Sequence, residues 1–277
     1  MDLIFDSKHE YFVMEDQMIK TGNTIVYKAN DKKLNREVAI KEIPIKDKTG
    51  LKAAMHEIQV LAKFSDGEVP YIYDYHIQNN KLYIIMQWIQ GDSLEKKLDK
   101  KQVTEKELTK WMMELCEILE KLSRFNIYHK DIKPANLMIK NGRLVLIDFN
   151  ISMNLTSIFE GTVDYKAPEM GRNSKDVRRD KVDMYAIGVI LYEFYKGSVP
   201  KIGQEMFSPS IRSSEKTWTK FIEPIVNHPE IDKRMNEIIT RCMKYNPAQR
   251  YESYSKLKHD LKLVNTRGKN NGRKRSV

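Results

Sequence analysis

Residues 128–150 read YHKDIKPANLMIKNGRLVLIDFN, and this stretch carries the most specific pattern in the chain. Its middle predicts a β-hairpin, because the Asn-Gly pair at 141–142 accepts the positive φ angles of a type I′ turn and apolar β-formers flank it. Folding the chain at that turn brings Asn136 beside Asp148, with Asp131 one short loop away. One amide and two carboxylates, groups suited to binding magnesium and moving protons, therefore converge at the open end of the hairpin.

This stretch resembles the catalytic loop and metal-binding motif of the protein-kinase superfamily. The family pattern is His-Arg-Asp, four variable residues, Asn, and then Asp-Phe-Gly. Lys130 stands here for the arginine and Asn150 for the glycine. The resemblance runs from about residue 11 to 264 and implies an α+β, two-lobed fold, with a β-rich N-lobe that carries one helix and a mainly helical C-lobe.

The resemblance also divides the chain. We expect the N-lobe at residues 1–88, with an N-terminal extension over about residues 1–10, and the hinge and C-lobe at 89–264. Residues 265–277 hold five basic side chains, no acid and almost nothing apolar, so they are expected to form a disordered tail. That tail is a solubilising end, a segment that binds nucleic acid or an anionic membrane surface, or the remnant of a juxtamembrane segment.

Composition places the chain among ordinary globular proteins. It has 277 residues, of which 41% are hydrophobic and 31% charged, with a net charge of +10. This length suffices for one large domain or two lobes with a sizeable core. The first residues lack the basic start and apolar core of a signal peptide, and the longest apolar run, near 186–195, is too short to span a bilayer.

The cysteines and histidines bear on the cellular compartment and on metal binding. Cys116 and Cys242 both lie in apolar helical patterns, which favours a reducing compartment without structural disulfides and hence a cytoplasmic location. The six histidines are scattered and show no metal-ligand spacing.

Two β-like runs around residues 21–24 occupy the place of the kinase glycine-rich loop, whose backbone N–H groups approach the ATP phosphates. The three glycine positions of the family hold Ile19, Thr21 and Thr24, and Gly22 lies one residue out of register. We therefore expect a degenerate nucleotide loop that binds phosphate less tightly.

Lys41 ends a predicted strand, and residues 51–61 show helical spacing of apolar side chains with Glu57 on the same helix. The resemblance implies that Glu57 pairs with Lys41 and holds it against the α- and β-phosphates.

Residues 82–86 predict a buried strand that leads into a hinge. The resemblance implies that the backbone of Gln87 and Ile89 meets the adenine edge, while Val26, Ala39 and Met138 contact its faces.

The resemblance assigns the chemistry to four residues of the opening stretch. Asp131 would accept or orient the substrate proton, and Lys133 would neutralise the transferring phosphoryl group. Asn136 and Asp148 would hold Mg²⁺, with Mn²⁺ as an alternative. The pattern Asp131-x-Lys133 together with Thr162 is that of serine/threonine kinases.

Other residues fit regulatory or structural places in the family. Residues 148–169 resemble an activation segment, in which Thr156 and Ser157 are candidate phosphoacceptors. Thr104 and Glu107 predict a capping box at the start of a long helix. The residues expected to serve the fold are His129, Phe149, Glu169, Asp183 and Arg250.

The sequence thus predicts a serine/threonine protein kinase that transfers the ATP γ-phosphoryl group to a protein hydroxyl and is capable of autophosphorylation. A pseudokinase acting as a binding or regulatory module is an alternative, suggested by the sparse glycine loop and Asn150. A small-molecule kinase of the aminoglycoside or choline type would share the fold, but residues 167–169 (Ala-Pro-Glu) with Arg250 argue against it. DNA or anionic-surface binding through the tail is compatible with either activity.

Overall fold

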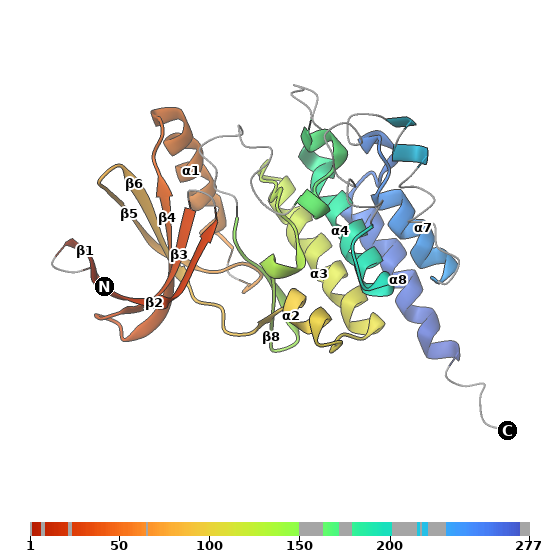
Figure 1. Ribbon diagram of the computed structural model, residues 1–277, viewed down its shortest axis with the longest axis horizontal. Coiled ribbons are helices and arrows are strands. Elements are labelled where there is room, and N and C mark those ends of the chain that lie inside the picture. The colour runs from red at the N-terminus through yellow and green to blue at the C-terminus, as the bar shows by residue number, and fades with distance from the viewer. Residues whose placement is uncertain are drawn as a thin grey trace. The chain divides into compact units, whose positions relative to one another are not determined.

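A computed structural model describes residues 2–6, 9–21, 24–64, 66–149, 163–171, 179–200, 215–216, 218–220 and 231–271 (Figure 1). The described chain forms two compact units. The first contains the residues up to Gly91 together with Val145–Ile147, and the second begins at Asp92. Ile89–Gly91, which the sequence grouped with the second lobe, lie with the first, where Gln90 Nε2 donates to Glu37 Oε2 at 2.8 Å.

The first unit is a six-stranded antiparallel sheet with one helix. The strand order is β1-β2-β3-β4-β6-β5, and the N-terminal extension supplies β1 and the start of β2. Helix α1 (Lys48–Leu61) begins at Asp47, whose Oδ1 accepts a hydrogen bond of 2.7 Å from Gly50 N. The strands are β1 (Asp2–Asp6), β2 (His9–Thr21), β3 (Thr24–Asp31), β4 (Arg36–Pro44), β5 (Ile72–Gln78) and β6 (Lys81–Gln87).

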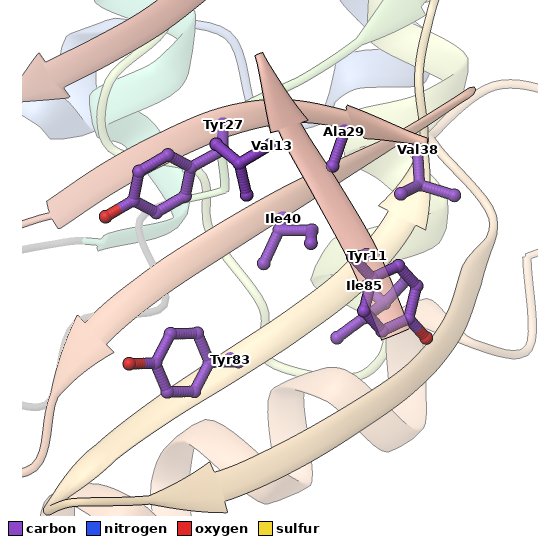
Figure 2. Close-up of a cluster of buried hydrophobic side chains, with 8 residues drawn as sticks. All are labelled: Tyr11, Val13, Tyr27, Ala29, Val38, Ile40, Tyr83 and Ile85. Carbon is purple, nitrogen blue, oxygen red and sulfur yellow. The ribbon is translucent and has the colours of Figure 1, made fainter. Parts of the chain in front are cut away.

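The two faces of this sheet differ in character. Successive side chains of a strand point to opposite faces, so Val38 and Ile40 of β4 lie on one face while Ala39 and Lys41 lie on the other. The first face carries a buried apolar cluster (Figure 2), whose members are Tyr11, Val13, Tyr27, Ala29, Val38, Ile40, Tyr83 and Ile85. The second face carries Ala39 and Lys41, which the resemblance assigned to nucleotide binding.

The second unit is built on helices. Thr104 and Glu107 form the predicted capping box of α3 (Glu105–Ser123), since Thr104 Oγ1 accepts from Glu107 N at 3.2 Å and Glu107 Oε2 accepts from Thr104 N at 2.9 Å. The other elements with described bounds are β7 (Asp92–Ser93), α2 (Leu94–Asp99), β8 (Leu137–Lys140), the start of β9 (Arg143–Leu146), α4 (Arg179–Lys196), α7 (Lys233–Cys242) and α8 (Tyr254–Asn271); the last two residues of β9 belong to the first unit. Short 3₁₀ turns lie at Pro134–Asn136, Val163–Tyr165, Pro168–Gly171 and Pro247–Gln249.

Close helix packing forms the core of this unit. Helix α4 is buried along most of its length and packs on α7, while α3 packs on α8 (Figure 1). A Cβ atom on Gly188 of α4 would lie 2.7 Å from Cys242 Cβ and 2.7 Å from Met243 Cγ. Glycine is therefore required where these two helices approach each other.

The last helix is longer than the sequence suggested. The predicted disordered tail starts at residue 265, whereas α8 continues to Asn271. No proline interrupts this stretch, so the helical hydrogen bonds propagate past the last apolar residues despite Gly268. Among the described helices, none combines the length and apolar character that crossing a lipid bilayer requires.

Candidate active site

The hairpin predicted at residues 137–146 is present. Strands β8 and β9 are neighbours in one small sheet, and the two turn residues, Asn141 and Gly142, have φ angles of 52° and 73°. Both angles are positive, as a type I′ turn requires. Trp111 Nε1 and Lys110 Nζ of α3 donate to the carbonyl of Gly142 at 3.1 and 2.7 Å, which ties the turn to the helix.

Asp131 is held by two neighbours from the same loop. Lys133 Nζ lies 3.0 Å from Asp131 Oδ2, and both side chains are only 14% exposed. Asn136 Nδ2 donates to the backbone carbonyl of Asp131 at 2.8 Å and to its Oδ2 at 3.2 Å. Both of these contacts of the carboxylate are made by Oδ2.

The backbone that presents Asp131 is fastened from α4. The buried carboxylate of Asp183 accepts hydrogen bonds from His129 N at 2.9 Å and Lys130 N at 2.7 Å. Burial raises the pKa of the Asp183 carboxyl above its ordinary value, although the His129 ring and these two N–H groups oppose the rise. Lys130 adopts a positive φ of 63°, which is uncommon for a residue with a side chain. Asp183 thus stabilises a strained loop conformation.

His129 lies under the same loop. Its Nδ1 accepts from Asp131 N at 3.4 Å, and its ring meets that of Phe149 edge-on with centroids 4.9 Å apart. The imidazole is buried, and it contacts the backbone N–H of Asp131 and the ring of Phe149, the residue after Asp148.

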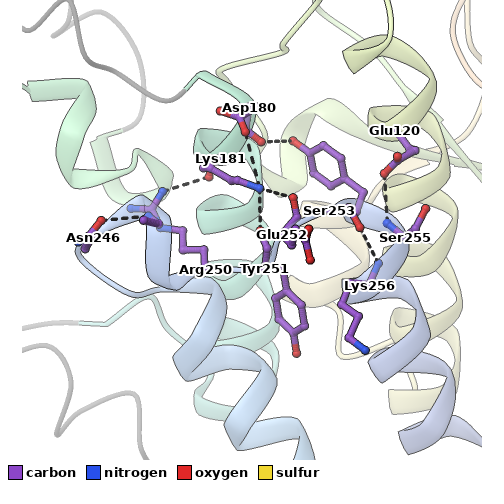
Figure 3. Close-up of polar contacts among 12 residues, drawn as sticks. Glu120, Asp180, Lys181, Asn246, Arg250, Tyr251, Glu252, Ser253, Ser255 and Lys256 are labelled. Atoms are coloured by element: carbon purple, nitrogen blue, oxygen red, sulfur yellow. Dashed lines mark hydrogen bonds and ion pairs between the residues drawn. The ribbon is translucent and has the colours of Figure 1, made fainter.

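Arg250 and Glu169 form a buried, two-pronged ion pair. The guanidinium nitrogens Nη1 and Nη2 donate to the two carboxylate oxygens at 2.6 and 2.8 Å. Arg250 also donates to the carbonyl of Lys181 at 3.0 Å, and Lys181 Nζ donates to the carbonyls of Tyr251 and Glu252 (Figure 3). Arg250 and Glu169 were both expected from the sequence to serve the fold, whereas Lys181 was not singled out, since a lysine at the start of a helix usually lies in solvent.

A small hollow of about 10 Å³ lies beside Asp131 within the second unit. Three segments form its wall: the loop that carries Asp131, the stretch around Ala167, and α4. The lining residues are Lys130, Asp131, Ile132, Tyr165, Lys166, Ala167, Met170, Val182, Asp183 and Ala186. Tyr165 is fixed there by donating from its hydroxyl to Glu193 Oε2 at 2.7 Å, and burial with that bond raises the pKa of Tyr165.

The first unit holds the predicted nucleotide residues other than Met138. Lys41 is buried on β4, directly opposite Val26 of β3, and Ala39 lies opposite Met86 of β6. Because Ala39 and Lys41 are two residues apart, they share one face of the sheet. Glu57 is half-buried on α1.

Two residues of the predicted hinge lie in the first unit. The backbone N–H of Gln87 donates to the carbonyl of Tyr71 at 2.8 Å. Ile89 is buried, and Met138 is half-buried on β8 of the second unit, opposite Ser93.

Several predicted residues fall outside the described part of the chain, namely Gly22, Asn150, Thr156, Ser157 and Thr162. The backbone of Thr21 ends β2 and pairs with Thr24 at the start of β3. The expectations for the activation segment and for Asn150 therefore stay predictions.

Comparison with known proteins gives relatives that match most of the chain. A probable serine/threonine-protein kinase of Clostridium perfringens is 26% identical over 255 residues, which cover 88% of this chain and 36% of that protein. Serine/threonine-protein kinase PrkC of Bacillus subtilis is 26% identical over 261 residues, covering 88% of this chain and 39% of PrkC. Aurora kinase B of Mus musculus is 29% identical over 261 residues, covering 90% of this chain and 71% of that kinase.

The chain thus spans less than half the length of the two bacterial relatives. The family model described as the protein kinase domain matches residues 16–261, which is nearly the whole of it. The chain belongs to the protein kinase family.

Proposed function

We propose that this chain is an ATP-dependent serine/threonine protein kinase. The observation that carries the proposal is the Asp131 carboxylate, oriented by Lys133 and Asn136 on a loop that Asp183 fastens. The family and the relatives named serine/threonine-protein kinases support the same activity. These relatives do not favour a pseudokinase.

In the proposed reaction a substrate hydroxyl attacks the γ-phosphorus of ATP. The bond from the γ-phosphorus to the bridging oxygen breaks, ADP leaves, and the hydroxyl proton passes to Asp131. Lys133 Nζ lies 3.0 Å from Asp131 Oδ2, so its ammonium group would lie close to the negatively charged γ-phosphoryl group during transfer. Such catalysis depends mainly on positioning and charge stabilisation, which explains why Asp131 is held by more than one neighbour.

Asn136 and Asp148 fit a magnesium ion by the chemistry of their oxygens. Because Asn136 binds Asp131 through its Nδ2, the amide oxygen Oδ1 is the atom that would serve as a metal ligand. Asp148 follows the second strand of the hairpin with a positive φ of 59° and would supply a carboxylate ligand. Carboxylate and amide oxygens are the ligands that Mg²⁺ prefers, and the ion would neutralise charge on the phosphates. Manganese, which accepts similar ligands, would substitute for it.

Lys41, with Glu57 as its partner, is proposed to hold the α- and β-phosphates. Lys41 is buried on the sheet face that also carries Ala39. A buried ammonium group requires an anion beside it, and the Glu57 carboxylate and the phosphates would be such anions, which supports this role. The backbone of Gln87 and of Ile89 would meet the adenine edge.

We also place the protein in the cytoplasm. Cys116 and Cys242 are free, buried thiols, and burial raises the pKa of Cys242 to about 12. Thiols of this kind are inert and require no oxidising compartment, and ATP is supplied in the cytoplasm. Binding of nucleic acid or anionic surfaces by the basic tail stays a prediction.

The activity is tested by incubating the full chain with γ-labelled ATP and Mg²⁺, alone and with a generic protein substrate. The proposal expects label on protein serine or threonine after acid hydrolysis, and none when a chelator removes the metal. Label confined to an added aminoglycoside or choline would establish a small-molecule kinase instead. Absence of transfer with ATP bound would establish a pseudokinase.

A further inference from the structure

We propose that His9, Asp74 and His76 form a binding site for a divalent transition-metal ion, with Zn²⁺ the best match. The site lies in the first unit and uses none of the residues assigned to phosphoryl transfer. Among the described residues, this is the one group of three or more histidine, cysteine or acidic side chains with ligand atoms at metal-binding distances.

The curl of the sheet creates the cluster. Strands β1 and β5 are its two edges, with four strands between them. Nevertheless Phe5 of β1 stacks on His76 of β5, with ring centroids 4.3 Å apart and planes inclined by 9°. His9, the first residue of β2, reaches Asp74 of β5. The two edges of the sheet therefore meet through these side chains.

The ligand atoms converge on one point. His9 Nε2 and His76 Nε2 each lie 3.5 Å from the same oxygen, Asp74 Oδ2. All three ligand atoms lie within 4.8 Å of one another. In a tetrahedral zinc site with bonds of about 2.0–2.2 Å, neighbouring ligand atoms are about 3.3–3.5 Å apart. Two of the three separations therefore already fit a bound ion.

The ligands are also oriented by their surroundings. Asp74 and His76 are two residues apart on a strand, so they share one face. Asp74 Oδ1 accepts from Tyr75 N at 2.8 Å, which turns Oδ2 toward the histidines. The Phe5 ring fixes the plane of the His76 imidazole. Supporting contacts of this kind hold ligands in place at known metal sites.

The chemistry of the three ligands selects the ion. Two imidazoles and a carboxylate suit Zn²⁺, Co²⁺, Ni²⁺ or Cu²⁺, whereas Mg²⁺ prefers an all-oxygen set. The side chains of His9, Asp74 and His76 are 34%, 40% and 16% exposed, so an ion can enter from solvent and keep a water as its fourth ligand. A bound ion would link the N-terminal extension to β5 and stabilise the first unit by mass action.

The test is a titration of the full chain with Zn²⁺ by calorimetry, in the presence of excess Mg²⁺ to occupy oxygen sites. The wild type should bind one zinc ion at this site, and its Tm should rise with added Zn²⁺. His9→Gln and His76→Gln should each weaken zinc binding by about 10- to 100-fold or more and abolish the rise in Tm. The matched control, His56→Gln combined with His259→Gln, removes two exposed histidines and should bind like the wild type.

Co²⁺ gives a second readout that is independent of stability. The wild type and the control should develop the visible absorption of a low-coordinate cobalt site, and the His9 and His76 variants should not. Circular dichroism confirms that each variant is folded. Zinc binding that survives in both variants, or a wild type that binds no zinc, would overturn the proposal. Lower stability of the variants without any metal effect in the wild type would mean that the cluster is a histidine–carboxylate ion pair only.

Discussion

At the level of single residues, the carboxylate of Asp183 fixes the conformation of the catalytic loop. It accepts hydrogen bonds from the backbone N–H groups of His129 and of Lys130, the residue whose φ is 63°, and so fixes the loop that carries Asp131. A lone aspartate before an apolar helix gives no such information by pattern, and the sequence identified it only through the family resemblance.

Replacing Asp183 by asparagine should destabilise the fold. An amide offers one acceptor oxygen where the carboxylate offers two, so one buried N–H would lose its partner at a cost of about 1–3 kcal/mol. Urea denaturation of Asp183→Asn measures the loss in the free energy of unfolding. Asp99→Asn, an exposed position on α2, is the control. Equal stability of the two variants would contradict the anchoring role of Asp183.

The nucleotide loop gives a second prediction at this scale. Thr21 and Thr24 pair at the ends of β2 and β3, at positions where the family has glycine. Thr21→Gly combined with Thr24→Gly should tighten ATP binding, because the backbone can then approach the phosphates more closely. Calorimetry with ATP and Mg²⁺ measures the affinity. Weaker binding would show that the threonine side chains contribute contacts of their own.

At the level of elements, the second unit is joined by a few specific contacts. The guanidinium of Arg250 links Glu169 to the start of α4, and Gly188 lets α7 approach α4 closely. Local signals predicted the elements themselves: the capping box at Thr104 and the Asn-Gly turn of the hairpin are read within a few residues. Contacts between elements have no such local signal, which is why the buried Lys181 was missed.

Arg250→Lys should destabilise the protein although it preserves the charge. Lysine cannot make the two parallel bonds to Glu169 or reach the carbonyl of Lys181 at the same time. Loss of one charged hydrogen bond costs about 1.5–3 kcal/mol, so the free energy of unfolding should fall by at least that amount. Thermal unfolding measures it, with the exposed Lys256→Arg substitution as control. A variant as stable as the wild type would rule out the two-pronged geometry.

Gly188→Ala tests the approach of α4 and α7. A methyl group would clash with Cys242 Cβ and Met243 Cγ at 2.7 Å, and overpacking of this kind costs about 1–3 kcal/mol. Alanine would otherwise strengthen the helix by up to about 1 kcal/mol, so the sign of the change in Tm decides which effect is larger. We expect a lower Tm, and a higher one would mean that the two helices can move apart.

At the level of the whole molecule, the sequence predicted the family and the type of fold because the kinase motifs are local and ordered along the chain. It missed the meeting of the sheet edges, since His9 is far in sequence from Asp74 and His76 and only the curl of six strands brings them together. It also ended the last helix too early, because the polar residues after 264 carry no helical stripe although α8 continues through Asn271.

We propose that Asp131 serves as the base of the phosphoryl transfer. The most direct measurement compares transfer from γ-labelled ATP by the wild type, Asp131→Asn and the exposed control Asp99→Asn, with ATP affinity measured in parallel. We expect Asp131→Asn to lower transfer by about 10²–10⁴-fold while its ATP affinity stays that of the wild type, and the control to keep full activity. Equal transfer by the wild type and Asp131→Asn would contradict the claim.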